Sequence, residues 1–534
     1  MGEDKFARLP GAWKNQKPLL ISLTVLLAIL LAALVWVLVG RPWVENEYLQ
    51  RQAAAMLPVH KAELEKLARA PRYTISATVD PLAGYITGQV EVDYTNPSQA
   101  SLSELVFRLY PNAGTIYGGG QLTVGQVALD GEDLQTELFE QDTALRVLLP
   151  QPLGPGRSIS LSLAFNAQAP SGFAQGYGIF NRTQEILSLA GWYPLLAVYQ
   201  DGWQAPPVPL VGDALHAEIS LYEVHLSVPA GYAVVSTGAQ LETGRAVSTA
   251  NDSPELTPAG QEWATWHFTS GPAREFAVAI AQDFEFYETQ VGGVTLRWVT
   301  LPGENSGISG EQALDMLTQA FQVFIDRFGP YPFTEFDLVE TPVSIGGYEF
   351  SGMVYIHDNA RLRSSPASLE YLLAHELAHQ WWYGLVGNHT VDEPWLDEAH
   401  ATYAAVLYFE DTGRPEEGER LVENWSREHG LPEPAARPVN ASALEFTDWS
   451  AYHKTVYIHG ALFLHHLRQR MGEEKFFELL HAYQHTYRYQ IMTTTDYMRM
   501  AEEVANRYMN SLFREWFQTG RLGSLTFHDK GRSH

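Results

Sequence analysis

The spacing of hydrophobic residues changes several times along the chain, and each change predicts a different kind of structure. An almost unbroken apolar run covers residues 19–39, which is long enough to span the hydrocarbon core of a bilayer. Residues 44–70 are rich in Ala, Leu, Glu, Lys and Arg, which favours a helical stalk. From Tyr73 to about residue 290, short alternating stretches between Gly, Pro, Asn and Asp predict antiparallel strands. Such a length without a long helical pattern is typical of a β-sandwich or saddle-like domain.

Helical spacing begins in the second half of the chain. Residues 310–329 place apolar side chains on one helical face, and two β-like runs follow around residues 346–347. Two further helices are predicted over residues 365–384 and 394–413. The whole pattern predicts an α+β multidomain fold with a tail over residues 1–17, a transmembrane anchor over 18–40, a helical stalk over 41–70, a β-rich domain over 71–290 and a mainly helical domain over 291–534.

Positive charge decides the orientation of the predicted anchor. Lys5, Arg8, Lys14 and Lys17 precede the apolar run, whereas both signs of charge follow it. An excess of Lys and Arg normally stays on the cytoplasmic side. The run is also longer than the apolar centre of a signal peptide, and it exits without a small-residue cleavage site. We therefore expect a single-pass protein of the cell membrane that contacts the lipid bilayer through this helix, with a cytoplasmic N-terminus and its other domains outside.

Composition narrows the chemistry that the chain can perform. There is no cysteine, which excludes disulfides, a thiolate nucleophile and a Cys-ligated zinc. The 35 Lys and Arg residues against 62 Asp and Glu residues give a net charge of −27. A nucleic-acid partner is therefore not expected, because binding one requires positive charge to neutralise phosphates. Histidine and carboxylate chemistry is what remains.

The stretch Tyr371–Gln380, "YLLAHELAHQ", carries that chemistry. His375 and His379 are four residues apart, so on a helix they point from the same face and can share one metal ion. Glu376 is rotated off that line and can reach a water on the metal without being a ligand. The arrangement predicts a general base beside an activated water.

A third ligand is available on the next predicted helix. Glu398 follows His379 by nineteen residues, which lets the first helix end, the chain turn and the second helix return a carboxylate to the two imidazoles. Three protein ligands with one open position describe a catalytic zinc site rather than a structural one. We predict one Zn²⁺ per chain, bound by His375, His379 and Glu398.

Together, "HELAHQWW" and "WLDEAHATY" resemble the gluzincin metallopeptidases of the M1 aminopeptidase family, in which H-E-x-x-H is followed after eighteen residues by a glutamate. The resemblance implies that His375, His379 and Glu398 bind zinc and that Glu376 is the general base. It also implies a β-rich N-terminal domain followed by a thermolysin-like catalytic domain. Many members continue into a large superhelical domain, for which no residues remain before His534, so we expect a more open cleft.

The family has a substrate-binding strand G-x-M-E-N upstream of the zinc helix, and "GGYEF" is the matching stretch. The resemblance implies that Gly346, Gly347 and Glu349 bind substrate, with Glu349 holding the free α-amino group. Tyr348 and Phe350 replace the usual Met and Asn. The retained carboxylate can still pair with an ammonium group.

A tyrosine beyond the third ligand stabilises the oxyanion in this family. "VYIHGALFLHHL" matches its usual setting with Tyr457, and Tyr452 is the alternative. A phenol is suited to this role because it donates a hydrogen bond where negative charge develops, without ionising at neutral pH.

Several other residues are predicted to stay outside the metal site. His481 and His485 repeat the four-residue spacing, but no glutamate follows the first and the surrounding pattern is that of a partly exposed helix face. His400 follows Glu398 by two residues, about 200° around the same helix, so its side chain should not reach the same metal. His389 lies in a connecting loop and at most touches substrate. In the β domain, the family sends a Gln or Glu to the substrate amino end, and Glu185 is the poorly matched candidate.

These predictions combine into a zinc-dependent peptide hydrolase that removes N-terminal amino acids from peptides or proteins. A zinc-activated water attacks the scissile bond while Glu376 takes its proton. Three alternatives remain open at the level of sequence: a zinc endopeptidase, an epoxide hydrolase as in one branch of the family, and a membrane-anchored pseudoenzyme that only binds peptides.

Overall fold

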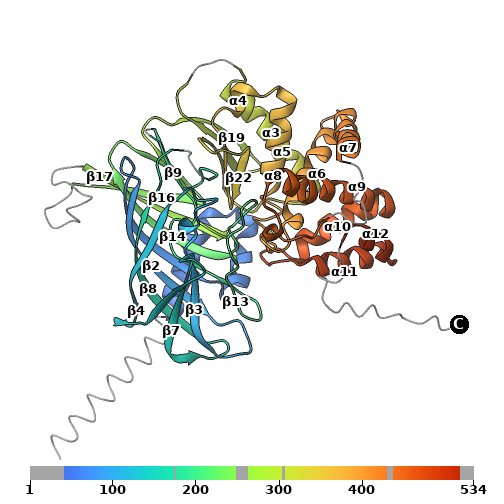
Figure 1. The fold of residues 1–534 in the computed structure, drawn as a ribbon. Coiled ribbons are helices and arrows are strands. Elements are labelled where there is room, and N and C mark those ends of the chain that lie inside the picture. Colours follow the sequence, from blue (N-terminus) through green and yellow to red (C-terminus); the bar gives the residue numbers. More distant parts are fainter. Residues whose placement is uncertain are drawn as a thin grey trace, which may run out of the picture.

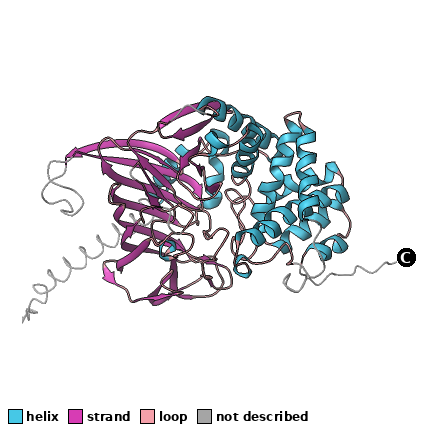
Figure 2. Ribbon diagram, turned by 45° about the horizontal axis from the view of Figure 1, so that its top comes forward, coloured by secondary structure: helices cyan, strands magenta, loops and turns pink. Residues whose placement is uncertain are grey.

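The computed structural model describes residues 41–172, 176–183, 185–247, 262–303, 307–429 and 437–517. A strand-rich half and a helix-rich half lie side by side, as Figures 1 and 2 show. The predicted α+β order, with the β domain first, is confirmed. The predicted anchor over residues 18–40 lies outside the described residues. Within the described ranges, no helix is both long and apolar enough to cross a membrane.

The β domain is built on an eight-stranded sheet with the strand order β16-β17-β14-β1-β2-β8-β4-β5. Along β8 every second residue from Leu161 to Ala167 is buried, because successive side chains of a strand point to opposite faces. The buried face packs on the domain core. The strands are β1 (Arg72–Asp80), β2 (Tyr85–Thr95), β4 (Gln121–Leu129), β5 (Glu132–Asp133), β8 (Ser158–Gln168), β14 (Ser220–Pro229), β16 (Ala239–Val247) and β17 (Glu262–Ala273).

Smaller sheets complete the β domain, in the orders β15-β18-β10-β9, β11-β3-β7-β6 and β12-β13. Aromatic rings fill the core between the sheets: the rings of Tyr73 and Tyr222 stack with their centroids 4.7 Å apart. The strands are β3 (Leu102–Arg108), β6 (Thr136–Phe139), β7 (Ala144–Leu153), β9 (Asn181–Arg182), β10 (Ile186–Leu189), β11 (Leu195–Leu196), β12 (Val198–Tyr199), β13 (Trp203–Gln204), β15 (Ala233–Ser236) and β18 (Val278–Ala281); a short 3₁₀ turn, η4, covers Tyr110–Asn112.

A separate five-stranded sheet, in the order β19-β20-β21-β23-β22, begins the helical half. Its first strand starts at Glu285, so the change of sheet lies at residues 282–284 and the predicted boundary at residue 290 falls inside β19. The alternation of β19 does not differ from that of the β-domain strands, and only pairing reveals which sheet it joins. The strands are β19 (Glu285–Val291), β20 (Val294–Thr300), β21 (Glu335–Thr341), β22 (Gly347–Phe350) and β23 (Met353–His357).

Helix α3 (Gly310–Phe328) packs against β19 and β20 of this sheet. Ser309 caps its N-terminus, and the side chain of Gln312 bonds back to the Ser309 backbone, which satisfies two of the N–H groups left free there. The predicted helix over residues 310–329 is confirmed. The other helices are α4 (Ala360–Arg363), α7 (Pro415–His429), η5 (Ala443–Glu445), α8 (Trp449–His453), η6 (Lys454–His459), α9 (Gly460–Met471), α10 (Glu473–Thr486), α11 (Thr494–Ala505) and α12 (Asn510–Trp516).

The two helices that carry the H-E-x-x-H motif and Glu398 are α5 (Pro366–Ala378) and α6 (Trp395–Asp411). Ser365 caps α5 by accepting a hydrogen bond from the Ser368 N–H. Helix α5 ends at Ala378, before the predicted end at Gly384, because the next residues turn tightly instead of continuing the helix. In Figure 1, α5 and β22 lie where the two halves of the molecule meet.

The segment predicted as a stalk is helical, but it packs along both domains. It consists of α2 (Arg41–Gln52) and the 3₁₀ segments η2 (Ala53–Ala55) and η3 (Pro58–Leu67). The Tyr48 hydroxyl donates to the Leu221 carbonyl of the β domain at 2.9 Å. The Glu63 carboxylate accepts from Arg488 of the helical domain at 2.9 Å. The segment therefore contacts both halves of the molecule and is not a free spacer.

Candidate active site

Three side chains, from α5, from its C-terminal cap and from α6, converge as predicted. The Nε2 atoms of His375 and His379 are 3.3 Å apart. The Oε2 atom of Glu398 lies 3.4 Å from the first of them and 3.6 Å from the second. All three residues are buried. The two helices therefore present three ligand atoms at the corners of a nearly equilateral triangle.

The size of this triangle fits a zinc ion. Ligand atoms held about 2.0–2.1 Å from a tetrahedral zinc lie roughly 3.4 Å from one another. Within the described residues, Glu398 Oε2 is buried and has no hydrogen-bond partner. A buried carboxylate oxygen without a partner is costly, and a metal ion removes that cost. The donor set of two imidazoles and one carboxylate is the one that catalytic zinc sites use.

Asp397 supports the metal site, and sequence reasoning missed this role. Its Oδ1 atom lies 2.5 Å from Nδ1 of His379. A carboxylate in this place holds the ring with Nε2 free to face the metal. Burial raises the pKa of Asp397 to about 6, against the opposing effect of His379. The available signal was its position directly before Glu398, which places it on the same buried first turn of α6.

Glu376 is buried beside the triangle and lines the same cavity, which has a volume of about 200 Å³. Burial, with smaller effects of nearby carboxylates, raises its pKa to about 8. Gly347 of β22 makes room for this side chain, because a Cβ atom on Gly347 would come within 2.3 Å of Glu376 Cδ. The predicted substrate strand and the predicted base are thus in direct contact.

Two more carboxyl groups line the cavity close to the predicted metal ligands. Glu349 lies on β22 as predicted, and its Oε1 atom has no hydrogen-bond partner among the described residues. Asp213 reaches the cavity from the loop between β13 and β14, and it was not predicted. Burial raises the pKa of both groups well above its usual range, and their mutual repulsion adds to the effect on Glu349. Gly346 also lines the cavity.

Tyr457 reaches the site from a widened turn of helix. Segment η6 is a π-helical turn that joins α8 to α9, and such turns often occur at functional sites. The Tyr457 hydroxyl donates a hydrogen bond to Oε1 of Glu398. Gly460 allows this approach, because a Cβ atom there would come within 2.4 Å of Ala399 Cβ on α6. The alternative, Tyr452, is buried against Gly212 and does not line the cavity.

Comparison with known proteins supports the resemblance to the M1 family for the helical half of the molecule. Residues 312–516 match the model of the peptidase family M1 domain. The match covers less than half of the chain, and residues 312–516 are called the M1 domain because of it. The resemblance predicted from the motifs is confirmed for this region, which contains the three predicted metal ligands, the predicted base Glu376 and Tyr457.

Curated relatives of the M1 domain are aminopeptidases. Aminopeptidase N of Streptomyces lividans is 26% identical over 258 residues, which are 45% of this chain and 29% of that protein. Human aminopeptidase N is 28% identical over 258 residues, which are 44% of this chain and 26% of that protein. The matched region therefore spans less than a third of each relative.

Solved structures share the fold over a larger part of the chain. An M1 zinc metallopeptidase from Deinococcus radiodurans superimposes with a TM-score of 0.61 at 22% identity, over 84% of this chain and 93% of that one. A mutant of the same enzyme bound to a Tyr-Ser-Ala substrate gives a TM-score of 0.61 over 84% of this chain and 95% of that one. The β domain and the M1 domain are both included in this shared fold.

The residues predicted to stay outside the metal site do so. Within the M1 domain, His400 is buried among aromatic rings, and burial lowers its pKa to about 3. His481 and His485 are exposed on α10. His389 Nε2 lies 2.6 Å from Gln200 Oε1 of the β domain. Glu185 is exposed and does not line the cavity.

The β domain also fixes the end of the zinc helix, which sequence reasoning did not foresee. Tyr383 follows α5 with φ +101°, a conformation that costs free energy for a residue with a side chain. Buried Arg274 donates to its carbonyl, and Glu275 accepts from its hydroxyl. Arg274 also donates to the Ala217 carbonyl at 2.9 Å. The chain reversal after His379 is thus held by the neighbouring domain.

The contact between Asp397 and His379 leads to a prediction for the M1 domain. We expect Asp397→Asn to weaken zinc binding by roughly 10- to 100-fold, because the amide cannot supply the negative charge that orients and polarises the ring. Competition with a metal chelator measures the affinity. Asp392→Asn, at an exposed residue of the preceding loop, is the matched control and should bind zinc like the wild type. Equal affinities for the two variants would contradict the assigned role of Asp397.

Proposed function

We propose that this protein is a zinc-dependent aminopeptidase that removes N-terminal amino acids from peptides or protein ends. The observation that carries the proposal is the charge of the cavity. Five buried carboxyl groups surround the two imidazoles, from Asp213, Glu349, Glu376, Asp397 and Glu398. Buried carboxylates at this density need positive charge for compensation. One zinc ion and one substrate ammonium group supply it.

The positions of the carboxyl groups indicate two binding places, one for the zinc ion and one for the substrate ammonium group. Glu398 faces the imidazoles and belongs to the metal triangle. Glu349 and Asp213 line the cavity without joining that triangle. Glu349 Oε1 has no hydrogen-bond partner among the described residues and can accept a hydrogen bond from an ammonium group. A peptide anchored there by its α-amino group presents its first peptide bond toward the metal. The cavity volume of about 200 Å³ suits one residue between the two places.

Each side chain around the metal triangle has its own role in hydrolysis. Zinc, when bound, polarises the scissile carbonyl and lowers the pKa of a water molecule. Glu376 takes a proton from the attacking water and returns it to the leaving amine. Glu376 packs against Gly347, which places its carboxyl group beside the substrate strand. Tyr457 donates a hydrogen bond to the developing oxyanion once its hydroxyl turns from Glu398.

One assay tests the proposal. The purified protein is given aminoacyl fluorogenic substrates and matched N-acetylated peptides, each with and without a metal chelator. Hydrolysis confined to free amino termini and lost with the chelator is the expected result. Cleavage of blocked peptides at the same rate would instead favour an endopeptidase, and activity that survives the chelator would contradict the zinc assignment.

The proposed ammonium site has its own prediction. We expect Glu349→Gln to lower kcat/KM for free aminoacyl substrates by roughly 30-fold, because a charge-assisted hydrogen bond contributes about 2 kcal/mol. Zinc content should not change, since Glu349 does not join the metal triangle. Steady-state kinetics on free aminoacyl substrates and metal analysis of the same sample measure the two quantities. An unchanged kcat/KM, or a loss of activity that follows a loss of zinc, would show that Glu349 does not recognise the amino group.

We further propose that residues 18–40 anchor the chain in the cell membrane, with the M1 domain on the extracytoplasmic side. The apolar run over residues 19–39 and the preceding positive charges support this. We expect the full chain to stay with membranes after alkaline carbonate extraction and a chain beginning at residue 41 to be released. Protease added outside intact cells should digest the M1 domain. Full-length protein in the soluble fraction would contradict the anchor.

A further inference from the structure

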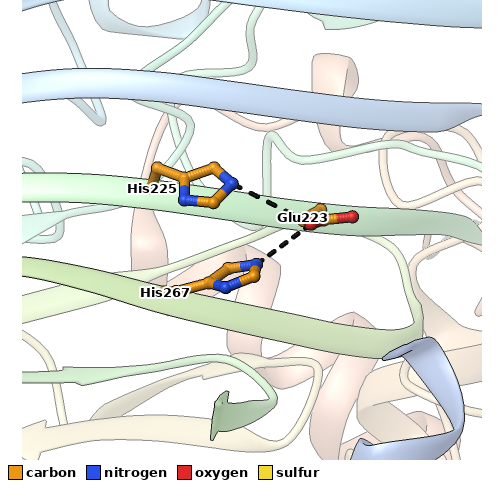
Figure 3. A group of neighbouring side chains, drawn as sticks. All are labelled: Glu223, His225 and His267. Carbon is orange, nitrogen blue, oxygen red and sulfur yellow. Dashed lines mark hydrogen bonds and ion pairs between the residues drawn. The ribbon is translucent and has the colours of Figure 1, made fainter. Parts of the chain in front are cut away.

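A second group of metal-ligating side chains lies on the β domain, on strands that contribute nothing to the active site. Glu223 and His225 are on β14, and His267 is on the neighbouring strand β17. Figure 3 shows both imidazoles directed toward the Glu223 carboxylate. Glu223 and His267 are buried, whereas the His225 side chain is 37% exposed. The group therefore has one side open to solvent.

The strand register brings these residues together. His225 and His267 are directly paired across the antiparallel β14–β17 ladder. Glu223 is two residues before His225, so its side chain is on the same face of the sheet. Val224 and Leu226 point the other way, into the domain core. The two imidazole rings stack with their centroids 4.1 Å apart and an angle of 23° between their planes.

The ligand atoms already lie within the range of a metal site. Glu223 Oε1 is 3.0 Å from His267 Nε2 and 3.9 Å from His225 Nε2. One ligand atom from each of the three residues lies within 4.8 Å of the others. Zinc ligands lie roughly 3.4 Å apart, so a small movement of the half-exposed His225 ring closes the set. We propose that Glu223, His225 and His267 bind a second transition-metal cation of the Zn²⁺ class.

Two neighbouring side chains orient this ligand set. Arg51 of α2 donates to Glu223 Oε2 at 3.0 Å and 3.1 Å, which leaves Oε1 to face the histidines. Glu242 of β16 lies across the sheet with its Oε1 atom 3.6 Å from His267 Nδ1. A carboxylate at the far nitrogen favours the tautomer with Nε2 free for a metal. The two carboxylates exceed the one guanidinium by one negative charge, which also favours a cation.

The chemistry of the donors selects the class of ion. Two imidazole nitrogens and one carboxylate oxygen suit Zn²⁺ and similar divalent transition metals, whereas Ca²⁺ and Mg²⁺ prefer sites made of oxygen. The open side at His225 leaves a position for water or another exchangeable ligand. Without a metal, Glu223 Oε1 and His267 Nε2 would share only their 3.0 Å hydrogen bond. Counting bound metal ions distinguishes the two cases.

The test uses the full chain, stripped of metal and then dialysed against buffered micromolar Zn²⁺. We expect two zinc ions per wild-type chain by mass spectrometry and one in the His225→Ala/His267→Ala double variant, with hydrolysis unchanged. The double variant His481→Ala/His485→Ala removes an exposed histidine pair elsewhere and should keep both ions. A wild type with one ion would overturn the proposal. Two ions retained in His225→Ala/His267→Ala would mean an adventitious ion only and would overturn it as well.

A second measurement needs no variant and so does not depend on how the double variant folds. Histidine modification by diethyl pyrocarbonate, followed by peptide mass spectrometry, is compared with and without Zn²⁺. We expect Zn²⁺ to lower the labelling of His225 several-fold while the labelling of His481 and His485 stays the same. Unchanged labelling of His225 would overturn the proposed site.

Discussion

Replacing Glu376 by glutamine is expected to lower kcat by roughly 10²- to 10⁴-fold while zinc content and KM stay near the wild-type values. Glutamine keeps the size of the side chain under Gly347 but cannot take a proton from water. Because Glu376 does not join the metal triangle, its carboxylate is not needed for zinc binding. Single-turnover kinetics and metal analysis on the same sample separate the two effects.

The matched control for this variant is Glu185→Gln. It makes the same chemical change at an exposed glutamate outside the cavity and should leave kcat unchanged. Full activity in Glu376→Gln would remove the proposed base. A parallel loss of zinc would instead assign Glu376 to metal binding.

The second large effect is expected from Glu398→Gln, which should abolish stoichiometric zinc binding and with it the hydrolysis of aminoacyl substrates. The amide removes the negative charge of one of three protein ligands, and its oxygen is a weaker donor to zinc. The loss of affinity should exceed the roughly 10- to 100-fold typical of a supporting carboxylate. Tyr457 can still donate to the amide oxygen, so the local fold is expected to persist.

Zinc affinity, measured by chelator competition, and circular dichroism on the same preparation check this prediction. Asp397→Asn is the graded comparison, because it alters a carboxylate one residue away that touches the metal site only through His379. A Glu398→Gln protein that holds zinc as tightly as Asp397→Asn would contradict the assignment of Glu398 as the third ligand.

Comparing Glu376→Gln with Glu398→Gln tests whether metal binding and proton transfer are separate functions of neighbouring carboxylates. The structure separates them by element: Glu376 is on α5 under the substrate strand, whereas Glu398 is on α6 beside the imidazoles. In Glu376→Gln we expect a metal-loaded and inactive protein. In Glu398→Gln we expect a metal-free and inactive one.

Local features of the site were predictable because they depend on spacing within one element. His375 and His379 are four residues apart, and any helix would place them on one face. The cap at Ser365 and the start of α6 after Pro394 also follow from short-range backbone chemistry. The end of α5 was not predictable, because the reversal at Tyr383 is held by Arg274 and Glu275 from another domain.

The sequence by itself determined the chemistry of this protein: a helical histidine pair with a base between them, a third carboxylate at a suitable interval, and a strand-rich domain before a helical one. Only the tertiary structure decided that Asp213 enters the cavity, that residues 41–67 contact both domains, and that His225 pairs with His267 on the neighbouring strand. These contacts join residues far apart in the chain. They depend on which distant strands pair and on how the domains pack, and the period of side chains within one strand shows neither.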